Sequence, residues 1–222
     1  MNKQSIGIVG TGNVGVAAAY ALFNQRLASE IILVDKDKKR AEGEAMDLMH
    51  GQLLVGNVNV ESGDYSDLSD AQVIVISAGI SQGSSSDSRL DLLNKNVEVF
   101  REIIAEIDKH APEAILVIAT NPVDILTYVT QQVSRRSAAR LIGTGTLLDT
   151  ARFRSLLGKY YGVDPKSVHA YILGEHGDSE VPIWSQAAIG GNPLQGNEIL
   201  GQSFEESKMN ALFEQTIMLL IT

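Results

Sequence analysis

The chain has 222 residues, no cysteine and a formal net charge of −9, from 27 acidic and 18 basic residues. The lack of cysteine excludes disulfides, thiolate metal ligands and cysteine nucleophiles, and the acidic balance disfavours binding to nucleic acid or to anionic membranes. No apolar segment approaches the roughly 20 residues of a membrane span, and the N-terminus has no apolar core of a signal peptide. We therefore expect a cytoplasmic protein that binds neither nucleic acid nor membrane.

Short apolar runs alternate with longer amphipathic stretches along most of the chain. The runs are rich in β-branched residues and nearly continuous, as expected for strands buried on both faces; they span residues 5–10, 30–35, 71–79, 113–121 and 140–145. Helical patterns lie between them, over residues 14–26, 38–49, 90–110 and 123–134. This alternation predicts an α/β fold with a doubly wound parallel sheet over residues 1–145. It weakens near residue 146, so we expect a second, α+β substrate domain over residues 146–222.

A glycine-rich turn follows the first predicted strand. Gly10, Gly12 and Gly15 stand in G-x-G-x-x-G order and open a helical pattern. The first glycine allows a tight turn, the second lets the backbone approach a pyrophosphate, and the third lets helix and strand pack closely. Asp35 ends the next strand, where a carboxylate binds ribose hydroxyls and repels the extra phosphate of NADP. A glycine turn alone indicates only a tight connection, but this context predicts a Rossmann domain that binds NAD.

Two further segments carry candidate catalytic side chains. Asp149 and Arg152 stand three residues apart at a predicted helix start, which sets them on one face. The planar guanidinium of Arg152 suits a substrate carboxylate, and Asp149 can orient an imidazole. Locally, an ion pair at a helix start explains both residues equally well. His176, in the stretch LGEHGDS, is likewise either a proton carrier or a polar loop residue.

The segments GTGNVG, ATNPVD, GTGTLLDTARFR and LGEHGDS occur in the order and approximate spacing of the lactate/malate dehydrogenase family. The chain resembles this family, and its L-lactate dehydrogenases in particular, from about residue 5 to 215. The resemblance implies hydride transfer between NAD and a 2-keto acid, with His176 as proton donor and acceptor, Asp149 as its orienting partner and Arg152 on the substrate carboxylate. It also implies a set of cofactor contacts beyond the glycine turn and Asp35, from Val14, Arg40, Tyr65, Gly79 and Asn121, the last of which also borders the substrate.

The segment 79–89, GISQGSSSDSR, corresponds to the loop that closes over the family's active site. The resemblance implies that Arg89 polarises the substrate carbonyl on closure and that Gln82 lies beside the variable group of the substrate. The family's malate enzymes carry arginine there, so neutral Gln82 favours pyruvate and L-lactate. GSSSDS is one residue longer than the usual Lys-Pro-Gly-Glu-Thr, which leaves hydroxyisocaproate-type and malate dehydrogenases as alternatives. The alternative interpretation of this stretch is a disordered Gly/Ser linker.

The resemblance extends to regulation and assembly. Arg154 and His169 match the pair that binds fructose 1,6-bisphosphate at a subunit interface in allosteric members, although a solvated arginine and a polar strand residue explain them equally well. Residues 40–51 match the family's dimer-forming helix, so we expect a homodimer or homotetramer. No metal site is predicted.

The family resemblance stops after FEQT (213–216), before the family's usual end. We therefore expect a truncated substrate domain, and we interpret residues 218–222 as the product of a shifted reading frame. A catalytically dead NAD-binding fragment is accordingly the alternative to an active enzyme.

Overall fold

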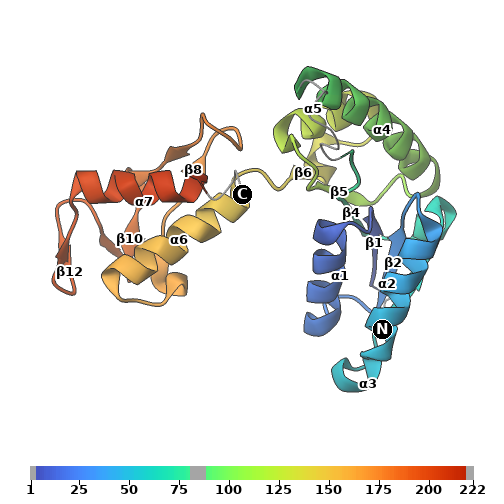
Figure 1. The fold of residues 1–222 in the computed structure, drawn as a ribbon, viewed down its shortest axis with the longest axis horizontal. Coiled ribbons are helices and arrows are strands. Elements are labelled where there is room, and N and C mark those ends of the chain that lie inside the picture. Colours follow the sequence, from blue (N-terminus) through green and yellow to red (C-terminus); the bar gives the residue numbers. More distant parts are fainter. Residues whose placement is uncertain (1–3, 81–88, 219–222) are drawn as a thin grey trace. The chain divides into compact units, whose positions relative to one another are not determined.

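The structure is a computed structural model that describes residues 4–80 and 89–218, with the side chains of all of these except 89–92 and 218. The chain divides into two compact units, residues 1–143 and residues 144–222, which are described separately (Figure 1). Gln82 and residues 219–222 lie outside the described residues. Arg89 begins a helix, but its side chain is also outside the described part.

The first unit is built on a six-stranded parallel sheet. Its strand order is β3-β2-β1-β4-β5-β6, in which the chain starts in the middle and winds outward in both directions. This order confirms the doubly wound sheet predicted from the sequence. The strands span Ser5–Val9 (β1), Glu30–Val34 (β2), Asn59–Ser62 (β3), Val73–Ile76 (β4), Ile115–Ile118 (β5) and Leu141–Gly143 (β6).

Helices cover both faces of this sheet, and each face has its own apolar core. The helices of this unit are Asn13–Gln25 (α1), Lys38–His50 (α2), Gln52–Val55 (α3), Arg89–His110 (α4) and Val123–Val133 (α5), with short 3₁₀ helices at Tyr65–Asp70 (η1) and Ala138–Arg140 (η2). Neighbouring residues of β2 show why two cores form, because Ile31 and Leu33 pack with α1 and α2, whereas Ile32 and Val34 pack with α4 and α5. Successive strand residues point to opposite faces, which explains the unbroken apolar runs.

A buried arginine secures the end of α4. The side chain of Arg136 is 2% exposed and forms an ion pair with Asp108 of α4. Its guanidinium also donates to the backbone carbonyls of Ala111 and Ala114, the latter at 3.0 Å. Ala111 and Ala114 lie in the connection between α4 and β5, so Arg136 ties the segment before β6 both to Asp108 of α4 and to the chain that follows this helix.

The second unit packs two long helices, Leu147–Tyr161 (α6) and Glu206–Met218 (α7), against short strands (Figure 1). Its core centres on Phe153, whose ring meets those of Trp184 and Phe213 edge-on at 5.1 and 6.2 Å. The strands form three small antiparallel sheets: Val168–His169 (β7) with Ala188–Ile189 (β10) and Asn192–Pro193 (β11), Ile172–Leu173 (β8) with Val181–Pro182 (β9), and Glu198–Ile199 (β12) with Gln202–Ser203 (β13). Short 3₁₀ helices at Pro165–Ser167 (η3) and Trp184–Gln186 (η4) connect them. Within the described ranges, no helix combines the length and apolar character that crossing a membrane requires.

Candidate active site

The glycine turn joins β1 to α1, and each of its glycines meets a different steric demand. Gly10 has a φ of +98°, and a Cβ there would lie 2.4 Å from the backbone nitrogen of Ala78. At Gly15 a Cβ would lie 1.9 Å from the carbonyl oxygen of Gly10, so only glycine lets helix and turn approach this closely. A Cβ at Gly12 would instead meet no atom of the described residues within 4 Å. Gly12 therefore leaves open space beside the start of α1, where unpaired backbone N–H groups attract phosphates.

Asp35 is joined to this turn by hydrogen bonds. Its Oδ2 accepts from the backbone N–H of Thr11 at 2.6 Å and from the Thr11 hydroxyl at 2.8 Å, while its Oδ1 accepts from the N–H of Asp37 at 2.9 Å. Burial raises the pKa of Asp35, but these hydrogen bonds and the nearby Arg40 outweigh it, and the net pKa is lowered. Asp35 is therefore an ionised acceptor held beside the glycine turn.

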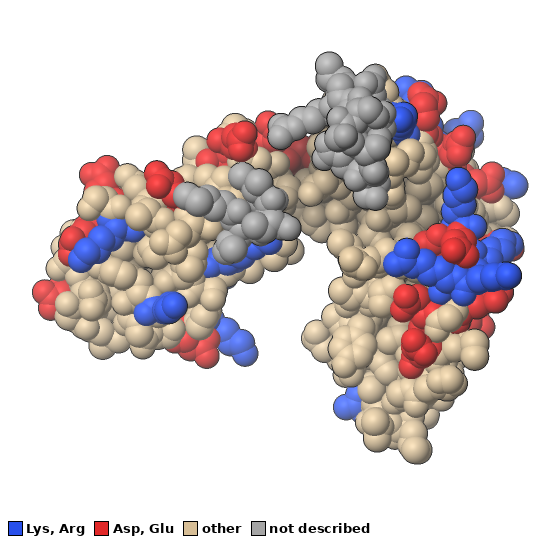
Figure 2. All heavy atoms as spheres, in the orientation of Figure 1, with Lys and Arg blue, Asp and Glu red and all other residues tan. Residues whose placement is uncertain are grey.

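Acidic and basic side chains are interspersed on the surface of the first unit around α2 (Figure 2). Arg40 is exposed in the first turn of α2, and Lys38 pairs with Asp64 at 2.7 Å. This hydrogen bond raises the pKa of Lys38. Because Asp64 already balances the charge of Lys38, this lysine does little to weaken the repulsion that Asp35 exerts on a phosphate.

The other candidate cofactor residues of this unit follow the strands at the same edge of the sheet. Gly10, Asp35, Gly79 and Asn121 come after β1, β2, β4 and β5 respectively, and the carboxyl ends of parallel strands share one edge. Ligands of doubly wound sheets bind at this edge, where the strand order reverses between β1 and β4. Tyr65 begins η1, and burial, with smaller effects of nearby acids, raises its pKa to about 12.

Asn96 was not identified from the sequence, and it anchors the segment that leads into residues 81–88. This side chain is 2% exposed on α4, where its Oδ1 accepts from the N–H of Ile80 at 2.7 Å and its Nδ2 donates to the carbonyl of Ile80 at 3.2 Å. Thr120 donates to the carbonyl of Ala78 at 2.8 Å. In the sequence, Asn96 has the pattern of an ordinary helix residue, and only its burial distinguishes it.

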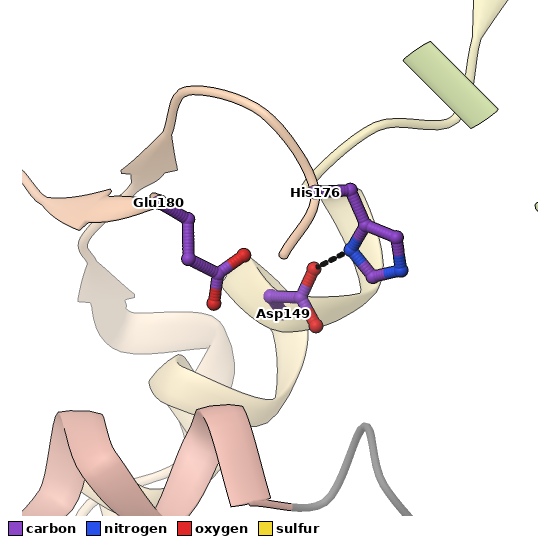
Figure 3. Close-up of side chains that lie close together, drawn as sticks. All are labelled: Asp149, His176 and Glu180. Atoms are coloured by element: carbon purple, nitrogen blue, oxygen red, sulfur yellow. Dashed lines mark hydrogen bonds and ion pairs between the residues drawn. The ribbon is translucent and has the colours of Figure 1, made fainter. Parts of the chain in front are cut away.

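In the second unit, Asp149, Arg152 and His176 meet. Asp149 is fully buried on α6, and its two carboxylate oxygens have different partners. The Oδ2 lies 2.6 Å from Nδ1 of His176 (Figure 3). The Oδ1 lies 3.2 Å from a guanidinium nitrogen of Arg152. The structure thus joins the helix start and the LGEHGDS loop, which are far apart in the sequence.

The loop that carries His176 is attached to α6 by two threonines. Thr146 donates to the carbonyl of Ile172 at 2.7 Å, and the Thr150 hydroxyl accepts from the N–H of the same residue at 3.0 Å. Two glycines of the loop have positive φ, +111° at Gly174 and +156° at Gly177. These contacts fix β8 against α6, and the following turn carries the imidazole back to Asp149.

Glu180 was also missed in the sequence, and it lies beside this cluster (Figure 3). It is 3% exposed, and one donor atom each of Asp149, His176 and Glu180 lies within 4.8 Å of the other two. Such side chains also bind metal ions, but the 2.6 Å from Asp149 to His176 has the length of a charge-assisted hydrogen bond. Two ligand atoms that each lie about 2.0 Å from one tetrahedral zinc ion would be roughly 3.3 Å apart. The shorter distance between Asp149 and His176 therefore fits a hydrogen bond and not a shared metal ion.

Arg154 of α6 contacts the backbone directly after His169 of β7. The Nε of Arg154 donates to the carbonyl of Ala170 at 2.8 Å, and its guanidinium lies 4.7 Å from the ring centre of Tyr171. His169 is exposed on β7. The arginine is therefore held against the backbone next to His169.

Comparison with known proteins decides the family. Residues 4–143 match the lactate/malate dehydrogenase NAD binding domain, and residues 146–217 match the alpha/beta C-terminal domain of the same family. The chain belongs to the lactate/malate dehydrogenase family. This finding and the sheet order confirm the resemblance and the fold class predicted from the sequence.

Several relatives that the chain matches carry the name L-lactate dehydrogenase. The chain is 65% identical over 215 residues to the enzyme of Salinibacter ruber, covering 97% of this chain and 68% of the relative. The enzyme of Priestia megaterium is 46% identical over 213 residues, covering 96% and 67%. A crystal structure of a ligand-bound minor L-lactate dehydrogenase from Enterococcus mundtii superposes with a TM-score of 0.92 at 42% identity, covering 98% and 69%. The chain thus spans about two thirds of the length of these proteins.

Proposed function

We propose that the chain is an NAD-dependent L-lactate dehydrogenase, which interconverts pyruvate and L-lactate. The observation that carries this proposal is the buried carboxylate of Asp149, which contacts both His176 and Arg152. An imidazole and a guanidinium held by one carboxylate can supply a proton and bind a substrate carboxylate. The names of the matched relatives favour lactate over the malate and hydroxyisocaproate alternatives.

His176 acts as the acid in the direction of pyruvate reduction. NAD, when bound in its reduced form, supplies the hydride to the carbonyl carbon. Negative charge then develops on the carbonyl oxygen, and a proton from the imidazolium neutralises it. Asp149 keeps Nδ1 of His176 engaged and stabilises the protonated ring, so the other ring nitrogen, which points away from Asp149 in Figure 3, exchanges the proton.

The cofactor residues of the first unit fit NAD. The open space at Gly12 admits the pyrophosphate, and Asp35 accepts hydrogen bonds from the ribose hydroxyls. Val14, Gly15, Arg40, Tyr65, Gly79 and Asn121 complete the proposed cofactor contacts. Gln82 and Arg89 are proposed to face the substrate, Gln82 at its methyl group and Arg89 at its carbonyl oxygen.

The direct test is the oxidation of NADH by pyruvate, 2-ketoisocaproate and oxaloacetate, compared under one set of conditions. We expect the highest kcat/KM with pyruvate. A preference for oxaloacetate would assign the chain to the malate branch of the family. Binding of NADH without turnover of any of the three acids would contradict an enzymatic role and favour an NAD-binding protein.

We also propose that Arg154 and His169 bind fructose 1,6-bisphosphate and that the chain forms a homodimer or homotetramer in the cytoplasm. A fixed arginine beside an exposed histidine suits a phosphate group. We expect fructose 1,6-bisphosphate to lower the KM for pyruvate and to raise the mass measured by light scattering. An unchanged KM and mass would contradict this regulation.

A further inference from the structure

Glu180 is an acidic side chain in an unusual position for its type. It lies between the LGEHGDS loop and β9, and it is 3% exposed. Neither of its carboxylate oxygens makes a hydrogen bond of good geometry with a described residue, although Asp149 and the backbone of Gly177 lie nearby. Acidic side chains are almost never buried without a partner, because losing hydration without compensation destabilises the charged form. The burial of Glu180 therefore points to a neutral, protonated carboxyl group.

The surroundings of Glu180 explain which acid of the site keeps its proton. The groups that face its carboxyl are Asp149 of α6 and His176 of the loop (Figure 3). Arg152 contacts the Asp149 oxygen that does not bind His176. Two carboxylates this close do not both ionise readily. Asp149 contacts both Arg152 and His176, whereas Glu180 contacts no basic side chain at hydrogen-bond distance among the described residues. Burial raises the pKa of Glu180 to about 7, with repulsion by Asp149 adding to this and attraction by His176 opposing it.

We propose that Glu180 is a positioning residue for the proposed reaction, whose carboxyl group holds its proton more tightly while His176 is neutral and loses it more readily when His176 is protonated. One nitrogen of His176 and one carboxylate oxygen of Glu180 lie within 4.8 Å of each other, and in this proposal each group changes the proton affinity of the other by the same factor. This inference rests on the proposed function only in giving the proton of His176 a role in catalysis.

The coupling has a definite sign. An ionised Glu180 favours the imidazolium, which pyruvate reduction requires, and so extends the pH range of that direction upward. Replacing Glu180 with neutral glutamine removes this charge and lowers the pH at which His176 loses its proton. A unit charge at 4.8 Å shifts a titration by about 0.6 pH unit even at the dielectric constant of water.

The test is an NMR titration of the histidine rings in the whole chain without substrate, which reads protonation independently of turnover. The chain has four histidines, and the His176→Gln variant assigns the signal of His176. We expect the His176 midpoint to fall by about half a pH unit or more in Glu180→Gln. An unchanged midpoint would overturn the proposal, whereas absence of turnover with normal coupling would count only against the proposed function.

Glu175→Gln is the matched control. It removes the same charge from the residue next to His176, but Glu175 is exposed and its carboxylate accepts from the Ser179 hydroxyl at 3.2 Å. Water screens this charge, so we expect a smaller shift of the His176 midpoint than in Glu180→Gln. Equal shifts in the two variants would attribute the effect to net charge and contradict a specific role of Glu180.

A reciprocal measurement keeps the proposal testable if Glu180→Gln fails to fold. Carbon-13 labelling of the glutamate carboxyl groups reports Glu180 directly, with a midpoint near neutrality in the wild-type chain. His176→Gln removes the favourable imidazolium and should raise that midpoint. A Glu180 signal that titrates in the ordinary acidic range of glutamate would overturn the proposal.

Discussion

The buried carboxylate of Asp149 divides its two oxygens between His176 and Arg152. Its side chain is fully buried, whereas those of His176 and Arg152 are 15% and 26% exposed. The anion is thus the hidden part of the cluster, and the two groups that would meet a substrate are the accessible ones. This distribution suits a residue that orients others rather than one that reacts.

His176→Gln should abolish turnover while leaving the glycine turn and Asp35 unchanged. General acid–base catalysis contributes about 10²- to 10⁴-fold, so we expect kcat to fall by at least about 100-fold. NADH binding, measured by the fluorescence of the bound cofactor, should be retained, because the cofactor residues belong to the other compact unit. A variant with wild-type kcat would contradict the assignment of His176.

Arg152→Lys tests the substrate clamp separately. Lysine keeps the charge beside Asp149 but loses the planar, two-pronged geometry that matches a carboxylate. We expect the KM for pyruvate to rise by about tenfold or more, the equivalent of one charge-assisted hydrogen bond, with a smaller change in kcat. Steady-state kinetics over a range of pyruvate concentrations measures both constants, and an unchanged KM would contradict the role.

The residues of the site differ in how far the sequence could predict them. Gly10, Gly15 and Asp35 follow from a local pattern, since their spacing alone indicates a tight turn and an acceptor after the next strand. His176 and Asp149 are 27 residues apart, and their local sequences do not indicate that they form a pair. Only the family resemblance predicted their roles. Glu180 carries no local signal, because an acid near a loop is usually solvated and its burial depends on the folded unit.

At the scale of the elements, the central strands and the long helices were predictable because their apolar patterns are long. The edge strand β3 was missed, since Val60 is the only buried residue of Asn59–Ser62. The two-residue strands of the second unit were missed for a related reason: paired segments this short have no periodicity. Their pairing depends on contacts between separate segments, such as His169 of β7 with Ala188 of β10.

The connection before β6 supplies a stability prediction at this scale. Arg136→Met removes the guanidinium that neutralises Asp108 and binds two carbonyls in the connection that follows α4. Breaking a buried ion pair from one side leaves the other charge uncompensated, and we expect a loss of about 3 kcal/mol in the free energy of unfolding. Urea denaturation followed by circular dichroism measures it.

Arg135→Met is the control for this prediction. Arg135 precedes the buried arginine, but its side chain is exposed and only its backbone N–H contacts Asp108, at 3.1 Å. We therefore expect a change of no more than about 0.5 kcal/mol. Similar losses in the two variants would show that the buried network around Arg136 does not carry the stability of this segment.

At the scale of the whole molecule, the chain separates the proposed cofactor residues from the acid–base cluster. Residues 1–143 carry the glycine turn and Asp35, and residues 144–222 carry Asp149, Arg152, His176 and Glu180. Each unit has its own core, so a perturbation at Glu180 acts first on the stability of the second unit. The single tryptophan, Trp184, packs against Phe153 in that core and reports on this unit alone.

Stability of the second unit should therefore depend on pH through Glu180. Its pKa is raised from 4.5 to about 7 in the folded chain, so between these values the folded state holds a proton that the unfolded state has lost. Stability then decreases as pH rises through this window, by up to about 3 kcal/mol from this group. Glutamine does not titrate, so the urea midpoint of Glu180→Gln, followed by Trp184 fluorescence, should fall less than that of the wild-type chain between pH 5 and pH 7. The difference between the two pH dependences isolates Glu180 from every other titrating group, and parallel curves would show that its carboxyl group is already ionised when the unit folds.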